Sequence, residues 1–213
     1  MIRSWAGGLV VGLVCVAGTA KADPDTHDGF QFRGTIGGGY LSDSEKIEGN
    51  FGGLTLDGEA TIKGGAGLLE LYFGGTPVPG LVFGGYLSGM SAPGPTVEVD
   101  GESQEADDDQ ALNLASFGPY VDYYPDPTGG FHVLGSLGYA QISASDDGDT
   151  RESATSTGFT LGAGVGYDAF VADEWSLGGL ARLGYAWTGH EQDGVDITDN
   201  AFMFGLSFSV AYH

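Results

Sequence analysis

The stretch AFMFGLSFSVAYH, residues 201–213, alternates with a period of two. A period of two indicates a β-strand, because successive side chains point to opposite faces. A strand with one bulky apolar face and one small, uncharged face is typical of the wall of a transmembrane β-barrel. The opposite face here holds Met, Gly, Ser and Ala, and the apolar face holds Phe202, Phe204, Leu206, Phe208, Val210 and Tyr212.

The beginning of the chain has the pattern of a secretory signal peptide. A basic start at Arg3 precedes an apolar run from Trp5 to Gly18, and Ala20-Lys21-Ala22 fits a small-x-small cleavage site. The apolar run is shorter than the roughly 20 residues of a spanning helix. We therefore expect residues 1–22 to be removed together with the single cysteine, and residues 23–213 to form one outer-membrane β-barrel domain.

Charge and composition limit the class of protein. The formal charge of −22 becomes −24 when Arg3 and Lys21 leave with the signal peptide. Binding to nucleic acid is excluded by this balance, because it depends on clustered Lys and Arg. The 40 glycines and the acidity would fit disorder, but 12 Phe and 10 Tyr, many at period two, favour a folded chain.

Seven further segments have the same strand pattern. Between them, short turns rich in Pro, Gly and Asp alternate with long segments near 42–60, 92–109, 144–154 and 189–200. An even-stranded barrel with short periplasmic turns and long outer loops has this rhythm. In the fourth predicted strand, the bulky apolar residues Leu112 and Leu114 fall on one face and Phe117 falls on the other. A bulge is therefore expected near Gly118-Pro119. The predicted strands are 30–41, 61–74, 81–91, 110–124, 131–143, 155–170, 175–188 and 201–212.

The distribution of charge separates a membrane barrel from a soluble one. The four long segments hold 20 of the 29 acids and only two bases, Lys46 and Arg151. Both faces of the predicted strands are nearly free of charge, whereas a soluble barrel of the lipocalin kind needs many charged residues on its solvent face. We therefore predict an all-β, eight-stranded, antiparallel up-and-down transmembrane β-barrel with acidic outer loops.

At this level the chain resembles the small eight-stranded outer-membrane barrels of diderm bacteria, of the OmpA transmembrane domain, OmpX and OmpW type. The specific motif is the strand that carries Gly205, Phe208, Val210 and Tyr212, which is similar to the signal read by the barrel-insertion machinery. The resemblance implies a monomer in the outer membrane that contacts lipid and lipopolysaccharide. It also implies a surface structural or interaction role without enzymatic activity, or alternatively a narrow conduit for small or hydrophobic molecules.

Charged residues inside the predicted strands are candidates for a lumen network. Arg33 and Glu70 share the parity opposite to the bulky apolar residues, at similar heights on neighbouring strands, so we expect them to pair. Asp168 and Arg182 are expected as a second pair or as shared partners.

Two further hypotheses concern catalysis and metal binding. Barrels that modify lipid A use a His with a Ser and an acid, so His132, Ser136 and Glu70 are candidates for a lipid A-modifying hydrolase; a histidine that fills a polar lumen is the simpler interpretation. In the third long segment, Asp146, Asp147, Asp149 and Glu152 are a candidate weak site for Ca²⁺ or Mg²⁺, which prefer oxygen ligands. A solvated, self-repelling loop is the alternative.

Overall fold

The computed structural model describes residues 26–51, 54–99, 102–106, 110–146, 155–192 and 195–213. These residues are built almost entirely of antiparallel strands. No helix long and apolar enough to cross a membrane occurs in this part of the chain. The eight long strands are β1 (Gly29–Phe51), β2 (Leu54–Val78), β3 (Leu81–Pro93), β6 (Gln110–Tyr123), β7 (Phe131–Asp146), β8 (Thr155–Ala172), β9 (Trp175–Gln192) and β10 (Val195–Tyr212).

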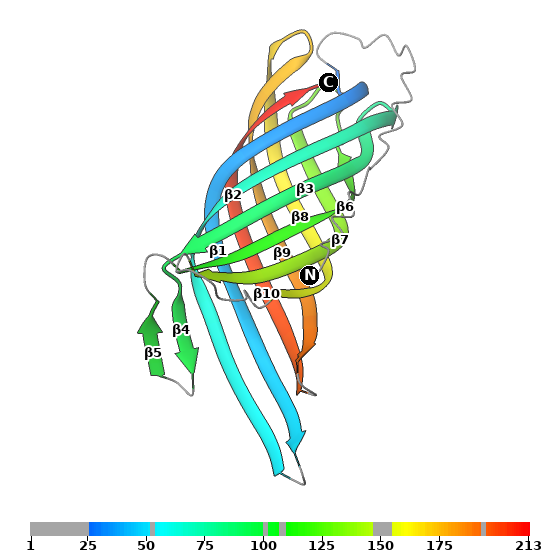
Figure 1. Cartoon of the computed structure of the whole chain (residues 1–213). Helices are drawn as coiled ribbons and strands as arrows, with labels where there is room; N and C mark the ends of the chain where they lie inside the picture. Colours follow the sequence, from blue (N-terminus) through cyan, green and yellow to red (C-terminus); the bar gives the residue numbers. More distant parts are fainter. Residues whose placement is uncertain (1–25, 52–53, 100–101, 107–109, 147–154, 193–194) are drawn as a thin grey trace, which may run out of the picture.

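The eight long strands close into a ring, as Figure 1 shows. Each strand pairs with its neighbours in chain order, and β1 pairs both with β2 and with β10, so the sheet has no free edge there. Two short strands, β4 (Thr96–Val99) and β5 (Glu102–Glu105), form a small hairpin that pairs with β2 outside the ring. The predicted eight-stranded up-and-down barrel is confirmed.

The two ends of the barrel differ (Figure 1). At one end, here called the turn end, tight connections at residues 79–80, 124–130 and 173–174 join the strands. At the other, the hairpin end, β1–β2 and β9–β10 project as paired strands beyond the ring. Segments 42–60 and 189–200, expected as loops, are therefore largely strand, and segment 92–109 contains β4 and β5. The polar residues of segments 42–60 and 189–200 are in strands because the β1–β2 and β1–β10 pairings of the ring continue into them without a register shift.

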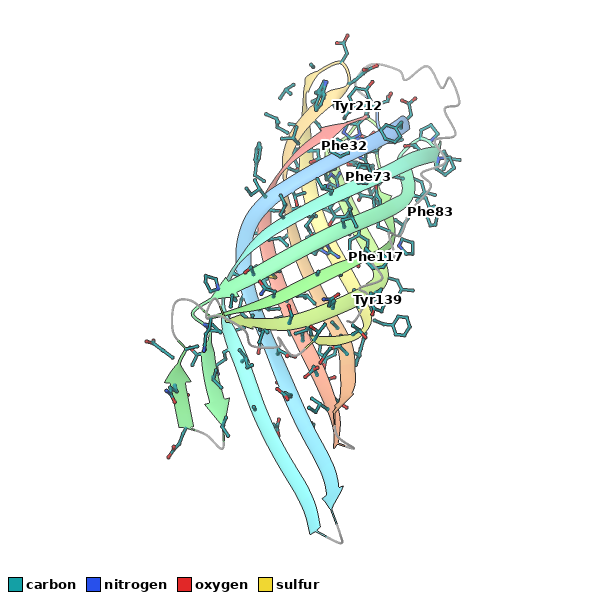
Figure 2. All side chains as sticks on the ribbon, in the orientation of Figure 1. Phe32, Phe73, Phe83, Phe117, Tyr139 and Tyr212 are labelled. Carbon is teal, nitrogen blue, oxygen red and sulfur yellow. The ribbon has the colours of Figure 1, made fainter. Side chains whose placement is uncertain are left out.

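The outer face of the ring is apolar and aromatic, as the strand pattern predicts. Figure 2 shows Phe32, Phe73, Phe83, Phe117, Tyr139 and Tyr212 pointing away from the barrel axis. Ile36 is 66% exposed and Phe159 is 68% exposed. Such a surface is stable next to lipid and would be unstable in water, where monomeric proteins rarely expose large apolar patches.

Strand β6 corrects one expectation. Its ladder with β3 runs without a register shift through Gly118 and Pro119, so the predicted bulge is wrong. Leu112 and Leu114 are buried inside the barrel, whereas Phe117 faces outward. The strand therefore keeps one parity, and the leucines belong to an apolar stretch of lumen rather than to the outer wall.

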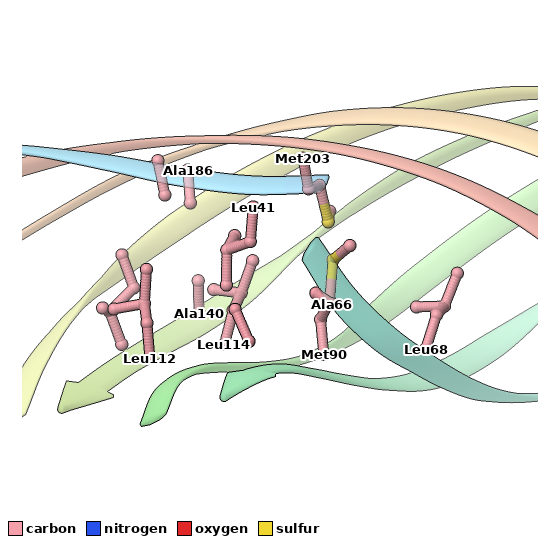
Figure 3. Packing of buried hydrophobic residues seen from close by; sticks show 12 residues of the cluster. Leu41, Ala66, Leu68, Met90, Leu112, Leu114, Ala140, Ala186 and Met203 are labelled. Carbon is pink, nitrogen blue, oxygen red and sulfur yellow. The ribbon is translucent and has the colours of Figure 1, made fainter. Parts of the chain in front are cut away.

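The interior is filled by two apolar clusters at different heights. The first, near the hairpin end, packs around Leu41, Met90 and Met203 (Figure 3). The second, closer to the turn end, consists mainly of aromatic residues. Its members are Tyr72, Val82, Tyr86, Tyr120, Tyr124, Leu134 and Leu180.

Candidate functional site

The lumen near the turn end holds a buried network of charged side chains centred on Arg33. Its guanidinium donates to Asp122 through Nη1 and to Asp168 through Nη2, each at 2.7 Å. Nη2 also donates to the Tyr124 hydroxyl. The side chains of Arg33 and both aspartates are fully buried. A buried charge is costly unless it is paired and hydrogen-bonded. The carboxylates of Asp122 and Asp168 therefore offset the cost of burying the charge of Arg33.

His132 of β7 extends this network across the lumen. Its Nδ1 lies 2.7 Å from Oδ1 of Asp122, and its Nε2 lies 3.6 Å from Oδ2 of Asp168. Asp168 also accepts hydrogen bonds from the Tyr124 hydroxyl at 2.9 Å and from Ser209 Oγ at 3.0 Å. The Arg33 network therefore ties together residues from β1, β7, β8 and β10 and the end of β6.

A second charged pair lies farther from the turn end. Arg182 of β9 donates through Nη1 to Oε1 of Glu70 on β2, and through Nη2 to Ser136 Oγ at 2.9 Å. Glu70 is additionally held by two hydroxyl groups, those of Thr35 and Ser88, each 3.2 Å from a carboxylate oxygen. This pair joins strands that are not neighbours in the ring, so it braces the barrel from inside.

Tyrosine rings occupy the space between the two charged groups. The rings of Tyr72 and Tyr120 meet edge to face with centroids 5.0 Å apart. The guanidinium of Arg182 lies 5.0 Å from the centroid of Tyr86 and donates to the Tyr72 hydroxyl at 3.0 Å. These contacts fill the cross-section of the barrel with aromatic rings and ion pairs.

The segment before β1 closes the turn end. His27 is 1% exposed and stacks on Tyr124 with ring centroids 3.6 Å apart. Its backbone N–H donates to the Pro127 carbonyl at 2.8 Å, and its carbonyl accepts from the Gly80 N–H at 2.9 Å. His27 is thus bonded to two different turns, and its ring covers the base of the Arg33 network.

His213, which follows β10, completes this closure. Its Nδ1 lies 3.1 Å from Nδ1 of His27, and its Nε2 lies 2.8 Å from Ser176 Oγ. Burial lowers the pKa of His27 to about 4 and that of His213 to about 3. Both imidazoles are therefore neutral at neutral pH, which avoids two adjacent positive charges.

The charged residues face the lumen, and Asp168 and Arg182 are shared partners of Arg33 and Glu70, one of the two arrangements expected for them. Arg33 is bound to Asp122 and Asp168, and Glu70 is bound to Arg182. The expectation that Arg33 pairs with Glu70 was therefore wrong. The register explains the difference, because Glu70 stands opposite Thr35 and lies one inward step farther from the turn end than Arg33.

The proposed hydrolase constellation is not assembled. His132 is hydrogen-bonded to Asp122, whereas Ser136 and Glu70 are both bound to Arg182. The sequence analysis did not predict the role of Asp122. In a β6 strand without a bulge, Asp122 lies on the same face as Leu112 and Leu114, so the alternation would have placed it in the lumen.

The residues of the expected insertion signal lie on both faces of β10. Phe208 and Val210 point outward and are 52% and 37% exposed, whereas Gly205 faces the lumen beside Leu68. The hydroxyl of Tyr212 donates to Oε2 of Glu174 at 2.6 Å. Their function as an insertion signal stays a prediction.

The expected cation site in the third long segment lies mostly outside the described residues. Asp147, Asp149 and Glu152 lie outside the described residues, and Asp146 ends β7. Within the described ranges, no group of three or more His, Cys, Asp or Glu side chains is arranged to hold a metal ion.

Comparisons with known proteins agree on the fold. No protein-family model matches the chain, and no curated protein matches it. Among solved structures, the outer membrane protein OprG from Pseudomonas aeruginosa is 15% identical, over 90% of this chain and 100% of OprG, with a TM-score of 0.54. Neisserial surface protein A, from Neisseria, is 16% identical over 84% of this chain and 97% of its own, with a TM-score of 0.44. Ail of Yersinia pestis is 14% identical over 85% of this chain and 99% of its own, with a TM-score of 0.41. The similarity to OprG shows an outer-membrane β-barrel fold.

Proposed function

We propose that this protein is a non-enzymatic barrel of the outer membrane that presents acidic β-hairpins at the cell surface. In this orientation the turn end faces the periplasm and the hairpin end faces outward. The apolar outer face supports membrane insertion, and the alternation of short turns with long hairpins supports the orientation.

The observation that carries the proposal is the length of the β1–β2 hairpin. Beyond the buried Asp43, eight further residue pairs continue the ladder, from Ser44 opposite Thr61 to Phe51 opposite Leu54. At about 3.4 Å per residue this extension spans roughly 25 Å. A paired ladder presents side chains with less loss of conformational entropy on binding than a flexible loop would. Glu45 and Glu59, two acidic residues of this hairpin, suit a partner with a basic surface.

The filled lumen supports a role at the surface rather than as an aqueous channel. Ions crossing the barrel would have to displace the Arg33 network and the tyrosine rings. Breaking such buried pairs is costly. We therefore expect a closed barrel that acts through its hairpins.

Two measurements test this function on the full protein in lipid nanodiscs and planar bilayers. We expect no single-channel steps, and binding of an oligolysine peptide that falls at least tenfold when an Asn-Gly turn joins Glu45 directly to Ala60. A matched control neutralises Glu102 and Glu105 on β5 and leaves the β1–β2 hairpin intact. Regular conductance steps, or peptide binding unchanged by the shortened hairpin, would contradict the proposal.

A second candidate function, a conduit for small hydrophobic molecules, is favoured by one observation. The lumen near the hairpin end is apolar. Beside it, β2 stops pairing with β3 and begins to pair with β4. The β2–β3 ladder ends at Gly67 opposite Ser91, and β2 next pairs with β4 at Lys63. Residues 64–66 therefore lie between two ladders, next to the apolar cluster, and offer a route sideways into lipid. Faster transfer of a hydrophobic dye into liposomes, abolished by Ala66→Trp, would support this function.

A further inference from the structure

Three oxygen-bearing side chains lie on adjoining strands and face the lumen just above the apolar cluster, toward the hairpin end. Asp43 of β1 and Asp199 of β10 are each 4% exposed, and Thr188 of β9 is 5% exposed. Thr188 stands directly opposite Asp199 in the β9–β10 ladder. Asp43 stands opposite Ala201, two residues along the same face from Asp199. Diagonal neighbours of this kind lie within reach of one another.

Each of these side chains has a buried oxygen without a hydrogen-bond partner among the described residues. The atoms are Oδ1 of Asp43, Oδ2 of Asp199 and Oγ1 of Thr188. Buried polar atoms are almost always hydrogen-bonded, so three such atoms on adjoining strands require an explanation. Their common feature is that all three are acceptors, which a bound cation would satisfy together.

The electrostatic environment favours a cation. The negative charges of Asp199 and Glu45 act on Asp43. The described salt bridges give neither Asp43 nor Asp199 a basic partner, since Lys63 is bound to Glu98 and the lumen arginines lie nearer the turn end. The carboxylates of Asp43 and Asp199 lie next to the apolar cluster and repel each other strongly, because the low local dielectric weakens screening.

We propose that Asp43, Asp199 and Thr188 form a binding site for a hard divalent cation, Mg²⁺ or Ca²⁺. Two carboxylates and a hydroxyl with several retained waters are a common ligand set for Mg²⁺, and Ca²⁺ accepts the same oxygens with more waters. The site lies on different strands from the acidic run at residues 146–152. Its ligands come from β1, β10 and β9, so a bound ion would add a side-chain link between three strands that the β1–β10 and β9–β10 ladders already hold together.

The test is isothermal titration of the full barrel in nanodiscs with MgCl₂ and, separately, CaCl₂. The test variant is Asp43→Asn with Asp199→Asn, and the matched control is Glu102→Gln with Glu105→Gln. The control removes the same charge from exposed positions on β5. We expect the test variant to lose one bound ion per chain and the control to bind as many ions as the wild type.

A second variant and a stability measurement keep the test decisive if the double variant does not fold. Thr188→Val removes only the hydroxyl and should weaken the site several-fold. Mg²⁺ should also raise the unfolding temperature of the wild type more than that of Thr188→Val. Unchanged ion number in the aspartate variant, or unchanged affinity and stabilisation in Thr188→Val, would overturn the site. Such a result would mean that the two aspartates share a proton instead.

Discussion

The imidazoles of His27 and His213 face each other through their Nδ1 atoms at 3.1 Å, although the residues lie 186 positions apart. The Nε2 atom of His27 lies 3.0 Å from the Gly129 carbonyl and donates its proton there. The remaining nitrogen of His27 can then accept a hydrogen bond from His213. An extra proton on either ring would place a positive charge in a buried site near Arg33, which disfavours the charged form.

The first prediction follows from that pair and concerns pH. The pKa of each histidine falls from 6.5 in the unfolded chain to about 4 for His27 and about 3 for His213. The unfolded state therefore binds more protons below pH 6.5, so stability should fall as the pH drops from 6.5 toward 3. Urea unfolding in micelles at pH 7.5, 5.5 and 4.5 measures this. His27→Gln with His213→Gln should show a flatter pH dependence, and an equally steep one would refute the assignment.

The second prediction tests the pairing of Arg33. Arg33→Met should reduce the free energy of unfolding by about 3–5 kcal/mol, because it leaves two buried carboxylates without their cation. A double-mutant cycle with Asp168→Asn should give a coupling energy of about 0.5–3 kcal/mol. The same cycle with Glu70→Gln is the control and should give less than about 0.5 kcal/mol. Coupling to Glu70 as large as coupling to Asp168 would show that the expected Arg33–Glu70 pair forms after all.

The third prediction concerns assembly through β10. Replacing Phe208 and Tyr212 by Ser removes two outward aromatic or apolar contacts, so we expect less folded barrel in the membrane. Heat-modifiable mobility in gels of unboiled membranes reports folded protein. Tyr212→Phe is the control, since it loses only the hydrogen bond to Glu174. Wild-type levels of the folded double variant would exclude an insertion signal at these positions.

The fourth prediction concerns the space that glycines leave for the lumen network. A Cβ at Gly166 would lie 2.2 Å from Nε2 of His132, whereas one at Gly67 would meet nothing within 4 Å. Gly166→Ala should therefore reduce the free energy of unfolding by about 1–3 kcal/mol, as overpacking does. Gly67→Ala should change it by less than about 0.5 kcal/mol. Equal effects in denaturant unfolding would mean that His132 is free to move aside.

The sequence alone predicted the eight strands of the ring and most facings, because alternation along a two-sided wall is a local property, but it did not predict the β4–β5 hairpin. It failed on β6, since Leu112 and Leu114 are as apolar as lipid-facing residues yet lie inside. Hydrophobicity cannot separate the two faces where part of the lumen is also apolar. Partners across the lumen, such as Arg33 with Asp168, depend on the tilt and closure of the ring, which local pattern does not encode.

Ring closure also bears on the order of folding. Phe32 pairs with Tyr212 in the β1–β10 ladder, so the seam joins strands at opposite ends of the domain. All other ladders of the ring join strands that are close in the sequence, with only the short β4–β5 hairpin between β3 and β6. Such local contacts form sooner because a short loop costs less entropy to close. The β1–β10 seam is thus expected to be the slowest step. A fluorescent reporter on His27 that becomes buried in the final kinetic phase would time the moment at which the barrel becomes a closed cylinder.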